Sequence, residues 1–412
     1  ILDESYKNNV DNAKAQKGLQ VVDVGGVATC KSVIDGTDPN CVPVDVFKFQ
    51  GLSPEAFQYL YAPTYTHGVQ REMVLSGKLN GDLGDYNVKS PWASDGVAVA
   101  LGVEHRREDL KFEADALAQA GGARNSSGEL SVDEIYGELD LPLVQDAPFA
   151  KLLSLDAGYR YSSYKVGTNR TPVSTYKVEL QWAPTEDVRF RGGYNRAVRY
   201  PNISELFAPQ ALGTVAGQDP CSGPTPVASL AACQLTGVTP AQYGHIPECP
   251  ADTCVTLGGG NALLNPEEAN TYTAGFVLTP RAIPNFSMSL DYFNIRVNGY
   301  IGAVDSTTVI NQCVQSSNAF FCNLFHRDPR SGVIFGNDGY IVATSQNTGF
   351  LKTSGVDLTG DYRLDLNSGG RVDFSIVGTY LIDRITEQLP GLGTFDCAGL
   401  FGPTCGQPNP KW

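Results

Sequence analysis

The chain has 412 residues, a formal net charge of −14 and a charged fraction of 18%. A chain of this length with 42% hydrophobic residues can bury a large core, which excludes disorder. No run approaches the roughly eighteen consecutive apolar residues of a membrane-spanning helix, so we expect no transmembrane helix. Thirty Lys and Arg against 44 Asp and Glu give the wrong sign for neutralising phosphates, which excludes nucleic acid as a partner.

The two ends of the sequence favour a partial chain. The sequence opens at Ile1 without an initiator Met or a signal peptide, and it stops at Trp412 without a closing pattern. Natural processing at both ends is the alternative, and it would leave Trp412 as a bulky apolar terminus with nothing after it to bury it.

Strict alternation of apolar and polar residues dominates the chain. Between Met73 and Leu83, one side is Met, Leu and Gly, while the other is Val, Ser, Lys, Asn and Asp. This period of two is typical of a strand whose two sides meet different surroundings. The pattern predicts ten strands, at 73–83, 97–106, 134–141, 153–161, 176–182, 188–195, 270–279, 286–297, 342–364 and 371–382. In the run from Phe286 to Val297 the apolar phase slips at Tyr292 and Phe293, which predicts a β-bulge.

The predicted strands are longer than the five or six residues of an ordinary soluble strand. A transmembrane strand needs about nine to eleven residues, apolar towards lipid and polar towards the lumen, with aromatic residues at both interfaces. Aromatic residues near the strand ends of the apolar side predict such a girdle: Tyr159, Tyr161, Trp182, Tyr194, Tyr272, Tyr362 and Tyr380. Charged residues on the other side would face the lumen, where they could bond a plug or line a wet path: Lys78, Glu104, Arg106, Glu138, Arg160, Glu179, Arg189, Arg191, Asp357, Asp361 and Arg363.

The joins between strands alternate in length. Short joins are expected at 84–95, 142–151, 184–187, 280–285 and 365–370, and long ones at 107–130, 197–269, 298–341 and 383–410, with 1–70 as another long segment. Only 163–173 breaks the rule. Strands that run up and down in order then place all long joins at one end, as in an outer-membrane barrel.

The ten cysteines form five pairs of close neighbours, and every one lies in a long join. They are Cys30 and Cys41, Cys221 and Cys233, Cys249 and Cys254, Cys313 and Cys322, and Cys397 and Cys405. An even count in this arrangement predicts disulfides and an oxidising compartment. Loops of this length are expected to lack a core of their own, so that disulfides restrain them. A zinc site at His245, Cys249 and Cys254 is the alternative, although the spacing fits no known finger pattern.

Several segments resemble conserved motifs of TonB-dependent outer-membrane receptors, in the order that this family shows. They are Asn195–Pro209, Leu264–Glu268 followed by Thr271–Phe276, Ser289–Ile295, Asn347–Gly349 and Thr353–Asp357. The cysteine-bearing loops look most like the large proteobacterial branch. The resemblance implies an all-β transmembrane antiparallel barrel, 22-stranded when intact, of which residues 1–412 would cover roughly the middle half. The N-terminal plug, the TonB box and the last strands would be absent.

The same resemblance implies a function. Such a receptor lies in the outer membrane of a Gram-negative cell, binds a scarce nutrient outside and imports it with energy delivered by TonB. The nutrient class stays open among a siderophore or other metal chelate, a corrinoid and an oligosaccharide. Expected partners are outer-membrane lipid, TonB through the missing N-terminal region, the ligand, and a surface lipoprotein as a further candidate.

No catalytic or metal-binding motif stands out. HExxH, GxSxG and a phosphate-binding GK[ST] are absent, and the four histidines, at 67, 105, 245 and 326, are isolated. We therefore expect neither an enzyme nor a cofactor. Ligand contacts are predicted for residues of the long joins, each with a structural role as its alternative: Arg196, Arg199, Tyr243, Phe320, Phe321 and Phe325.

Two other classes of protein stay open. A passive outer-membrane barrel or adhesin would have the same wall without a plug. A soluble, secreted, disulfide-rich β-protein would also alternate, but the apolar sides of its strands would be pressed together in a closed double layer.

Overall fold

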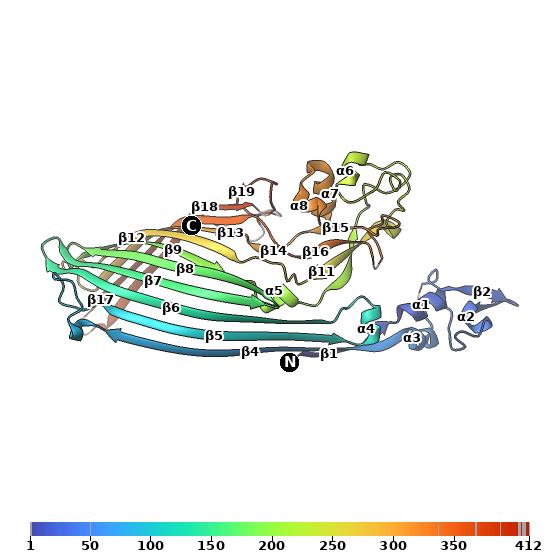
Figure 1. Ribbon diagram of the computed structural model, residues 1–412, viewed down its shortest axis with the longest axis horizontal. Coiled ribbons are helices and arrows are strands. Elements are labelled where there is room, and N and C mark those ends of the chain that lie inside the picture. The colour runs from blue at the N-terminus through green and yellow to red at the C-terminus, as the bar shows by residue number, and fades with distance from the viewer. Residues whose placement is uncertain are drawn as a thin grey trace.

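The computed structural model describes residues 2–49, 51–336, 338–366, 369–387, 389–402, 405 and 409–411. Its main feature is a curved antiparallel sheet, here called the wall, with the strand order β1-β4-β5-β6-β7-β8-β9-β12-β13-β17-β18-β19 (Figure 1). The wall strands are β1 Leu2–Val10, β4 Tyr61–Asp82, β5 Ala98–Ala114, β6 Ser126–Ala147, β7 Ala150–Val166, β8 Asn169–Ala183, β9 Val188–Arg199, β12 Glu267–Leu278, β13 Phe286–Asn298, β17 Phe350–Asp365, β18 Arg371–Glu387 and β19 Phe395–Asp396.

The ten predicted strands are all present. Most are longer than predicted because pairing continues past the apolar band; β6, for example, has 22 residues. The predicted strand 342–364 is wrong in its bounds. Its first part is β16 (Tyr340–Asn347), which belongs to a different sheet, and only β17 joins the wall.

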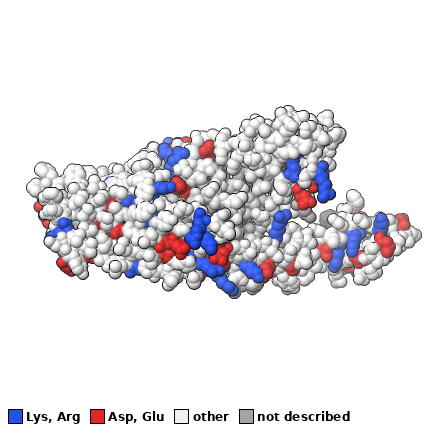
Figure 2. Space-filling view, viewed as in Figure 1, with Lys and Arg blue, Asp and Glu red and all other residues white. Residues whose placement is uncertain are grey.

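The register of the wall places the apolar positions of neighbouring strands side by side. Leu79 pairs with Leu101, Leu101 with Gly137, and Gly137 with Tyr159. This side is not covered: the side chains of Leu75 and Leu79 are 70% and 69% exposed. The left half of the sheet is accordingly mostly white in Figure 2, and charges cluster towards its middle. A soluble β-sandwich would bury this side, so the exposed band argues against that class.

The aromatic residues on this side form rows near the strand ends. Tyr194 contacts Tyr272, with ring centroids 4.9 Å apart, and Trp182 stacks on Phe190 at 5.5 Å. Trp182 also donates its indole N–H to the carbonyl of Phe149, 2.9 Å away in the neighbouring turn. An aromatic ring with one polar end suits the interface between lipid and water.

Long and short connections leave opposite edges of the wall. The loop edge carries 11–60, 115–125, 200–266, 299–349 and the chain after Glu387, whereas the turn edge carries 83–97, 148–149, 184–187, 279–285 and 366–370. All ten cysteines lie at the loop edge, as predicted. The expected long join 107–130 shrinks to 115–125 because β5 and β6 extend, and the exception at 163–173 is a two-residue turn at the loop edge.

The predicted bulge at Tyr292 and Phe293 is wrong. Strand β13 pairs without a register shift with both β12 and β17. The apolar phase changes there because the strand leaves the apolar band: beyond Tyr292 the same side continues as Asn294 and Arg296. Register shifts occur instead between Pro142 and Val144 and between Ser354 and Gly355.

The two longest loops fold together into one unit, here called the loop subdomain (200–266 and 299–349). Its strands are β10 Ala211–Ala216, β11 Thr253–Gly259, β14 Ile301–Ala303, β15 Phe325–His326 and β16, and β11 pairs with β16 across the two loops. Its helices are α5 Ile203–Phe207, α6 Leu230–Gln234, η2 Pro250–Asp252, α7 Ser306–Ser316 and α8 Ala319–Cys322.

The expectation that these loops lack a core is wrong. Buried residues of both loops meet in one cluster that includes Cys254, Val309, Phe321, Ile334 and Ile341. A second cluster surrounds the Cys221–Cys233 bridge. The subdomain therefore has a hydrophobic interior in addition to its disulfides.

The segment 11–60 at the loop edge, here called the distal loop, is a smaller unit at the far right of Figure 1. It contains α1 Asn12–Leu19, β2 Val21–Val24, β3 Val27–Cys30, α2 Lys31–Ile34 and α3 Pro54–Leu60. Its core holds Cys30, Cys41, Tyr59 and Leu60. Burial, together with a hydrogen bond that the hydroxyl donates to Asp38 at 2.9 Å, raises the pKa of Tyr59 to about 12.

Two short helices complete the secondary structure at the wall edges, α4 Ala116–Ala120 and η1 Gly84–Tyr86. Within the described part of the chain, no helix has the length and apolar character needed to cross a membrane.

Candidate functional site

The motif Asn195–Pro209 forms the junction between the wall and the loop subdomain. Arg199, the last residue of β9, donates to both carboxylate oxygens of Glu267 at 2.8 and 2.7 Å, and to Glu205 of α5 at 2.9 Å. Glu267 also accepts the backbone N–H of Ile301 at 2.7 Å. Arg199 thus joins the two ends of the loop 200–266, and its partner Glu267 links them to the start of the loop 299–349.

A second contact completes this junction. Asn347 accepts the backbone N–H of Asn265 at 2.7 Å, and its amide donates to the carbonyls of Asn265 at 2.8 Å and Gly299 at 2.9 Å. Arg199, Glu205, Asn265, Glu267 and Asn347 are here called the loop anchor. The motifs that resemble the receptor family therefore meet in space, although they are up to about 150 residues apart in sequence.

Helix α5 lies within the motif and packs on the inner side of the wall. Its N-terminus has a capping box, in which Asn202 accepts the N–H of Glu205 and Glu205 accepts that of Asn202. Ile203 and Leu206 pack against Leu130, Val132 and Tyr164. Phe207 lies where a Cβ on Gly128 would be, 2.1 Å from its ring, so only glycine allows this close approach.

The structure pairs all ten cysteines as predicted. The bridges are Cys30–Cys41, Cys221–Cys233, Cys249–Cys254, Cys313–Cys322 and Cys397–Cys405. The zinc alternative is wrong, because Cys249 and Cys254 are bonded to each other and supply no thiolate. No group of three or more metal-ligating side chains is found among the described residues.

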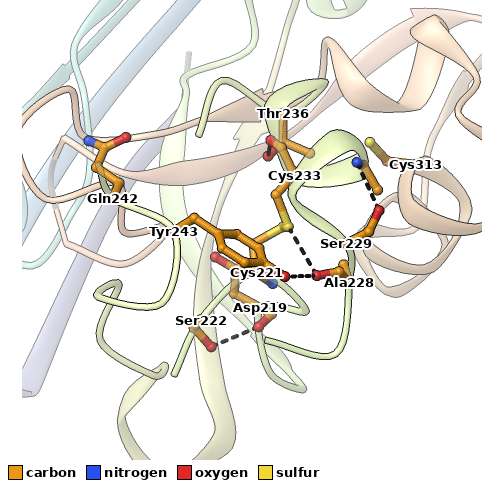
Figure 3. The surroundings of a disulfide bond; sticks show 12 residues. Asp219, Cys221, Ser222, Ala228, Ser229, Cys233, Thr236, Gln242, Tyr243 and Cys313 are labelled. Atoms are coloured by element: carbon orange, nitrogen blue, oxygen red, sulfur yellow. Dashed lines mark hydrogen bonds between the residues drawn. A yellow bond between two sulfur atoms is a disulfide. The ribbon is translucent and has the colours of Figure 1, made fainter. Parts of the chain in front are cut away.

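The predicted ligand contacts of the loops have structural partners. Tyr243 lies beside the Cys221–Cys233 bridge and donates its hydroxyl to the carbonyl of Ala228 at 2.7 Å (Figure 3). Phe321 is 0% exposed, and Phe325 is buried in the same cluster with Phe320 packed against it. Arg196 pairs with Glu268 at 2.9 Å. Packing explains the three phenylalanines and Tyr243 in this structure, and their contact with a ligand stays a prediction.

A buried ion pair that sequence reasoning missed holds the loop subdomain together. Arg327 donates to both carboxylate oxygens of Asp219 at 2.5 and 3.0 Å, and to Thr236 and the carbonyl of Gly332. The two charged side chains are 4% and 1% exposed. No sequence pattern links these residues, which lie 108 positions apart.

The inner side of the wall carries paired charges. Lys177 lies 3.1 Å from Glu138 and 3.0 Å from Asp156, Arg160 pairs with Glu134 at 3.0 Å, and Arg191 forms a bidentate pair with Asp291 at 2.7 and 2.6 Å. Glu134, Glu138, Arg160 and Lys177 also line a cavity of about 320 Å³. The partners Glu134 and Asp291 were missed by sequence reasoning, because alternation identifies a side of a strand but not the register between strands.

The remaining predicted lumen-facing residues share the same side of the wall. Arg106 pairs with Glu108 at 3.4 Å and Arg363 with Asp373 at 2.9 Å, while Asp357 accepts a hydrogen bond from Thr379 and Glu179 one from Gln181. Lys78, Glu104, Arg189 and Asp361 have no ion pair among the described residues. Their charged groups are therefore available to a segment placed inside the wall.

A second cavity of about 550 Å³, here called the mouth cavity, opens between the loop subdomain and the last loop. Tyr300, Asp305 and Thr308 line it from the second long loop, and Arg384, Thr386 and Glu387 from the end of β18. None of these residues was singled out from the sequence, because all six lie in the predicted long joins, where no alternation marks a side.

Electrostatic shifts outside the wall follow local hydrogen bonds. The backbone N–H and hydroxyl of Ser331, with the N–H of Arg330, hold the pKa of Asp328 below its usual range. Asp187, in the turn 184–187, accepts hydrogen bonds from the side chain and the backbone N–H of Arg281 in the neighbouring turn 279–285. These bonds lower the pKa of the Asp187 carboxyl. The hydrogen bonds that cause these two pKa shifts hold the local conformation of a loop and a turn, and they explain the shifts without a catalytic role.

A family model described as the β-barrel of TonB-dependent receptor-like proteins matches residues 45–394. No curated protein matches the chain.

Solved structures with similarity include a mutant ferric enterobactin receptor (PfeA) from Pseudomonas aeruginosa in complex with enterobactin. The identity is 16%, the TM-score is 0.47, and the match covers 82% of this chain and 40% of that one. The siderophore receptor PirA from Acinetobacter baumannii is 14% identical with a TM-score of 0.47, and the match covers 82% of this chain and 39% of that one. A double mutant of the Serratia marcescens hemophore receptor HasR, in complex with HasA and heme, is 12% identical with a TM-score of 0.43, and the match covers 84% of this chain and 46% of that one. The chain thus spans less than half the length of these proteins.

Proposed function

Since the chain belongs to the β-barrel family of TonB-dependent receptors, we propose that it is part of an outer-membrane receptor that binds a scarce nutrient at the cell surface and imports it with energy delivered by TonB. The family consists of transport receptors, and its barrels lie in the outer membrane. The proposal extends this to the whole protein of which the chain is a part, with a nutrient that is a metal chelate, a corrinoid or an oligosaccharide.

The two sides of the wall are the observation that supports the proposal best. One side is apolar, uncovered and edged by aromatic residues, which suits outer-membrane lipid. The other carries ion pairs and further charges, among them Lys78, Glu104, Arg189 and Asp361, for which no ion pair is found among the described residues. This side suits a hydrated lumen that holds a plug. The loop edge, with all five disulfides, would lie outside the cell, where disulfides persist.

Partners follow from this placement. In the proposal, a plug and a TonB box belong to the intact receptor, the described wall is roughly the middle half of a 22-stranded barrel, and lipid surrounds the apolar side. Lys78, Glu104, Arg189 and Asp361 are proposed to contact the plug, because these four have no ion pair within the described part of the wall. A surface lipoprotein is a further candidate partner at the loop edge.

Deletion of the chromosomal gene tests the proposal. The deletion strain, the strain complemented with the intact receptor, and a strain without TonB are compared for uptake of radiolabelled nutrients from all three classes at limiting concentration. We expect the first and third strains to lose uptake of one nutrient that the complemented strain recovers. Normal uptake of every candidate by the deletion strain would reject transport, and uptake that survives loss of TonB would identify a passive barrel.

A further inference from the structure

We propose that the loop subdomain and the mouth cavity select an uncharged, hydroxyl-rich ligand of the oligosaccharide class over an anionic metal chelate. This inference rests on the proposed function, of which it specifies the nutrient class. Two independent observations support it: the charge of the two long loops and the chemistry of the mouth cavity.

The loop subdomain is poor in cations. Residues 200–266 contain no Lys or Arg at all, and 299–349 contain only Arg327 and Arg330. Against these two stand seven acidic residues: Glu205, Asp219, Glu248, Asp252, Asp305, Asp328 and Asp338. The subdomain therefore has an excess of negative charge.

Two of these charges are withdrawn from the surface together, because Arg327 and Asp219 are buried against each other. Six acidic residues then remain against Arg330, and one of the six, Glu205, pairs with Arg199 of the wall. Arg330, which is exposed, is the one remaining Lys or Arg of the described parts of both loops. An anionic chelate would therefore meet more carboxylates than cations on the loop subdomain, and like charges both weaken binding and slow the approach of a ligand.

The mouth cavity has the chemistry that recognises hydroxyl groups. Tyr300 lines it with a half-exposed ring, which offers an apolar face and a hydroxyl. Thr386 adds a hydroxyl that can both donate and accept, and Glu387 adds a carboxylate that accepts. The hydroxyl of Thr308 already donates to Asp305 at 3.1 Å and can only accept. Arg384 is the single cation here, and Asp305 and Glu387 outnumber it.

Some of the polar groups that line the mouth cavity already form hydrogen bonds within the protein, so fewer groups are available to bind a ligand. Asp305 caps α7 by accepting the N–H of Thr308 at 2.9 Å, and Arg384 donates to Asn409. One oxygen of Glu387 accepts the N–H of Gly391 at 3.1 Å. As far as the described residues show, the Tyr300 ring, the Thr386 hydroxyl and the second oxygen of Glu387 are left for a ligand. A volume of about 550 Å³ lies within the usual range for small-molecule sites.

The test uses the intact receptor purified in detergent and isothermal titration with defined probes. The probes are the neutral oligosaccharides maltoheptaose, cellohexaose and xylohexaose, the anionic chelate ferric enterobactin, and cyanocobalamin. We expect at least one oligosaccharide to bind with an affinity that changes little with salt, and neither of the other two to bind. Binding of ferric enterobactin or cyanocobalamin, or of no oligosaccharide, overturns the proposal.

Variants assign the binding to the mouth cavity. Tyr300→Ala removes the proposed stacking face and should weaken oligosaccharide binding about tenfold, and Glu387→Gln should weaken it less. Tyr86→Ala is the matched control, since Tyr86 is an exposed tyrosine at the turn edge. Unchanged affinity in Tyr300→Ala would move the site elsewhere and overturn the assignment.

The two proposals fail in different ways. If the deletion strain loses uptake of a metal chelate or a corrinoid while its uptake of oligosaccharides is normal, the nutrient class proposed here is wrong and the transport function stands. If the deletion strain takes up everything normally, the transport function fails regardless of what the purified receptor binds.

Discussion

The wall and the loop subdomain are stabilised by different means within one chain. In the wall, backbone pairing between adjacent strands supplies the order, and its apolar side chains remain uncovered. In the loop subdomain, the strands are short, and apolar residues of two distant loops enclose disulfides and a buried ion pair. In the proposed membrane setting, lipid covers the apolar side of the wall, whereas the subdomain encloses its own apolar residues.

This difference indicates which part of the chain can change its ligand specificity while the wall keeps its structure. The loop anchor joins both loops to the wall through Arg199, Glu267 and Asn347. Beyond these residues, the subdomain has its own core, so its surface can vary while the wall stays the same. Four predictions test how separate the two regions are.

The largest effect is expected from the buried ion pair. Asp219→Ala leaves the guanidinium of Arg327 buried without a counter-charge, which should cost about 3–5 kcal/mol of subdomain stability. Backbone amides of 200–266 and 299–349 should then exchange with deuterium at least about a hundredfold faster, while those of β5 to β8 stay protected. Hydrogen exchange of the intact receptor, followed by mass spectrometry, measures both regions.

Two further variants sharpen this experiment. Asp338→Ala removes an exposed carboxylate and should change nothing. The double variant Asp219→Leu with Arg327→Met replaces both charges by apolar side chains and should be more stable than Asp219→Ala alone. Loss of protection in the wall of Asp219→Ala would show that the two regions unfold together.

Sequence predicted the wall far better than the loop subdomain, for a physical reason. The two sides of a strand repeat every second residue, so Leu75, Leu79 and Lys78 reveal their sides within one short segment. The pairing of Arg191 with Asp291 also needs the register between β9, β12 and β13, which no single strand contains.

The loop subdomain has no comparable period. Phe321, Ile334 and Ile341 share one buried cluster although they come from a helix, a turn and a strand. Their sequence gave no indication that they were core residues, and Phe321 was expected to contact a ligand. Cysteine neighbours were predictable because each bridge closes a loop of only 5 to 12 positions. The Asp219–Arg327 pair, with 108 positions between its members, was not.

A cation on the apolar side of the wall should destabilise the wall and leave the stability of the loop subdomain unchanged. Leu180 points to the apolar side of β8 between Trp182 and Val178, and Gln181 points to the inner side. Leu180→Arg should cost about 2–4 kcal/mol of folding free energy in a bilayer. Gln181→Arg, one residue along, should cost far less. Urea titrations of folding into lipid vesicles, followed by resistance to SDS, compare the two, and equal costs would contradict the assignment of sides.

Loss of one disulfide should destabilise the loop subdomain and leave the wall unchanged. Replacing Cys221 and Cys233 together by Ala removes a cross-link between positions 12 apart, which should cost about 3 kcal/mol of subdomain stability. Limited proteolysis of the intact receptor should then cut within 200–266 first, with the wall strands resistant. The double Ala variant of Cys30 and Cys41 is the matched control, since it should expose only the distal loop. Cleavage of the wall in either variant would show that the disulfides support more than their own loops.

The smallest effect is expected at the turn edge, where Arg281 lowers the pKa of Asp187. A carboxyl with a folded pKa below its unfolded value stabilises the folded state above the unfolded pKa, and this contribution is lost as the pH falls through the folded value. Arg281 is exposed and Asp187 is partly exposed, so the change should be slight and should decrease with salt. The stability of the wild type should therefore fall more between pH 5 and pH 3 than that of Asp187→Asn, as measured by urea unfolding in detergent at low salt. An identical pH dependence of the two proteins would mean that the pair contributes nothing, and that the backbone turn alone closes this edge of the wall.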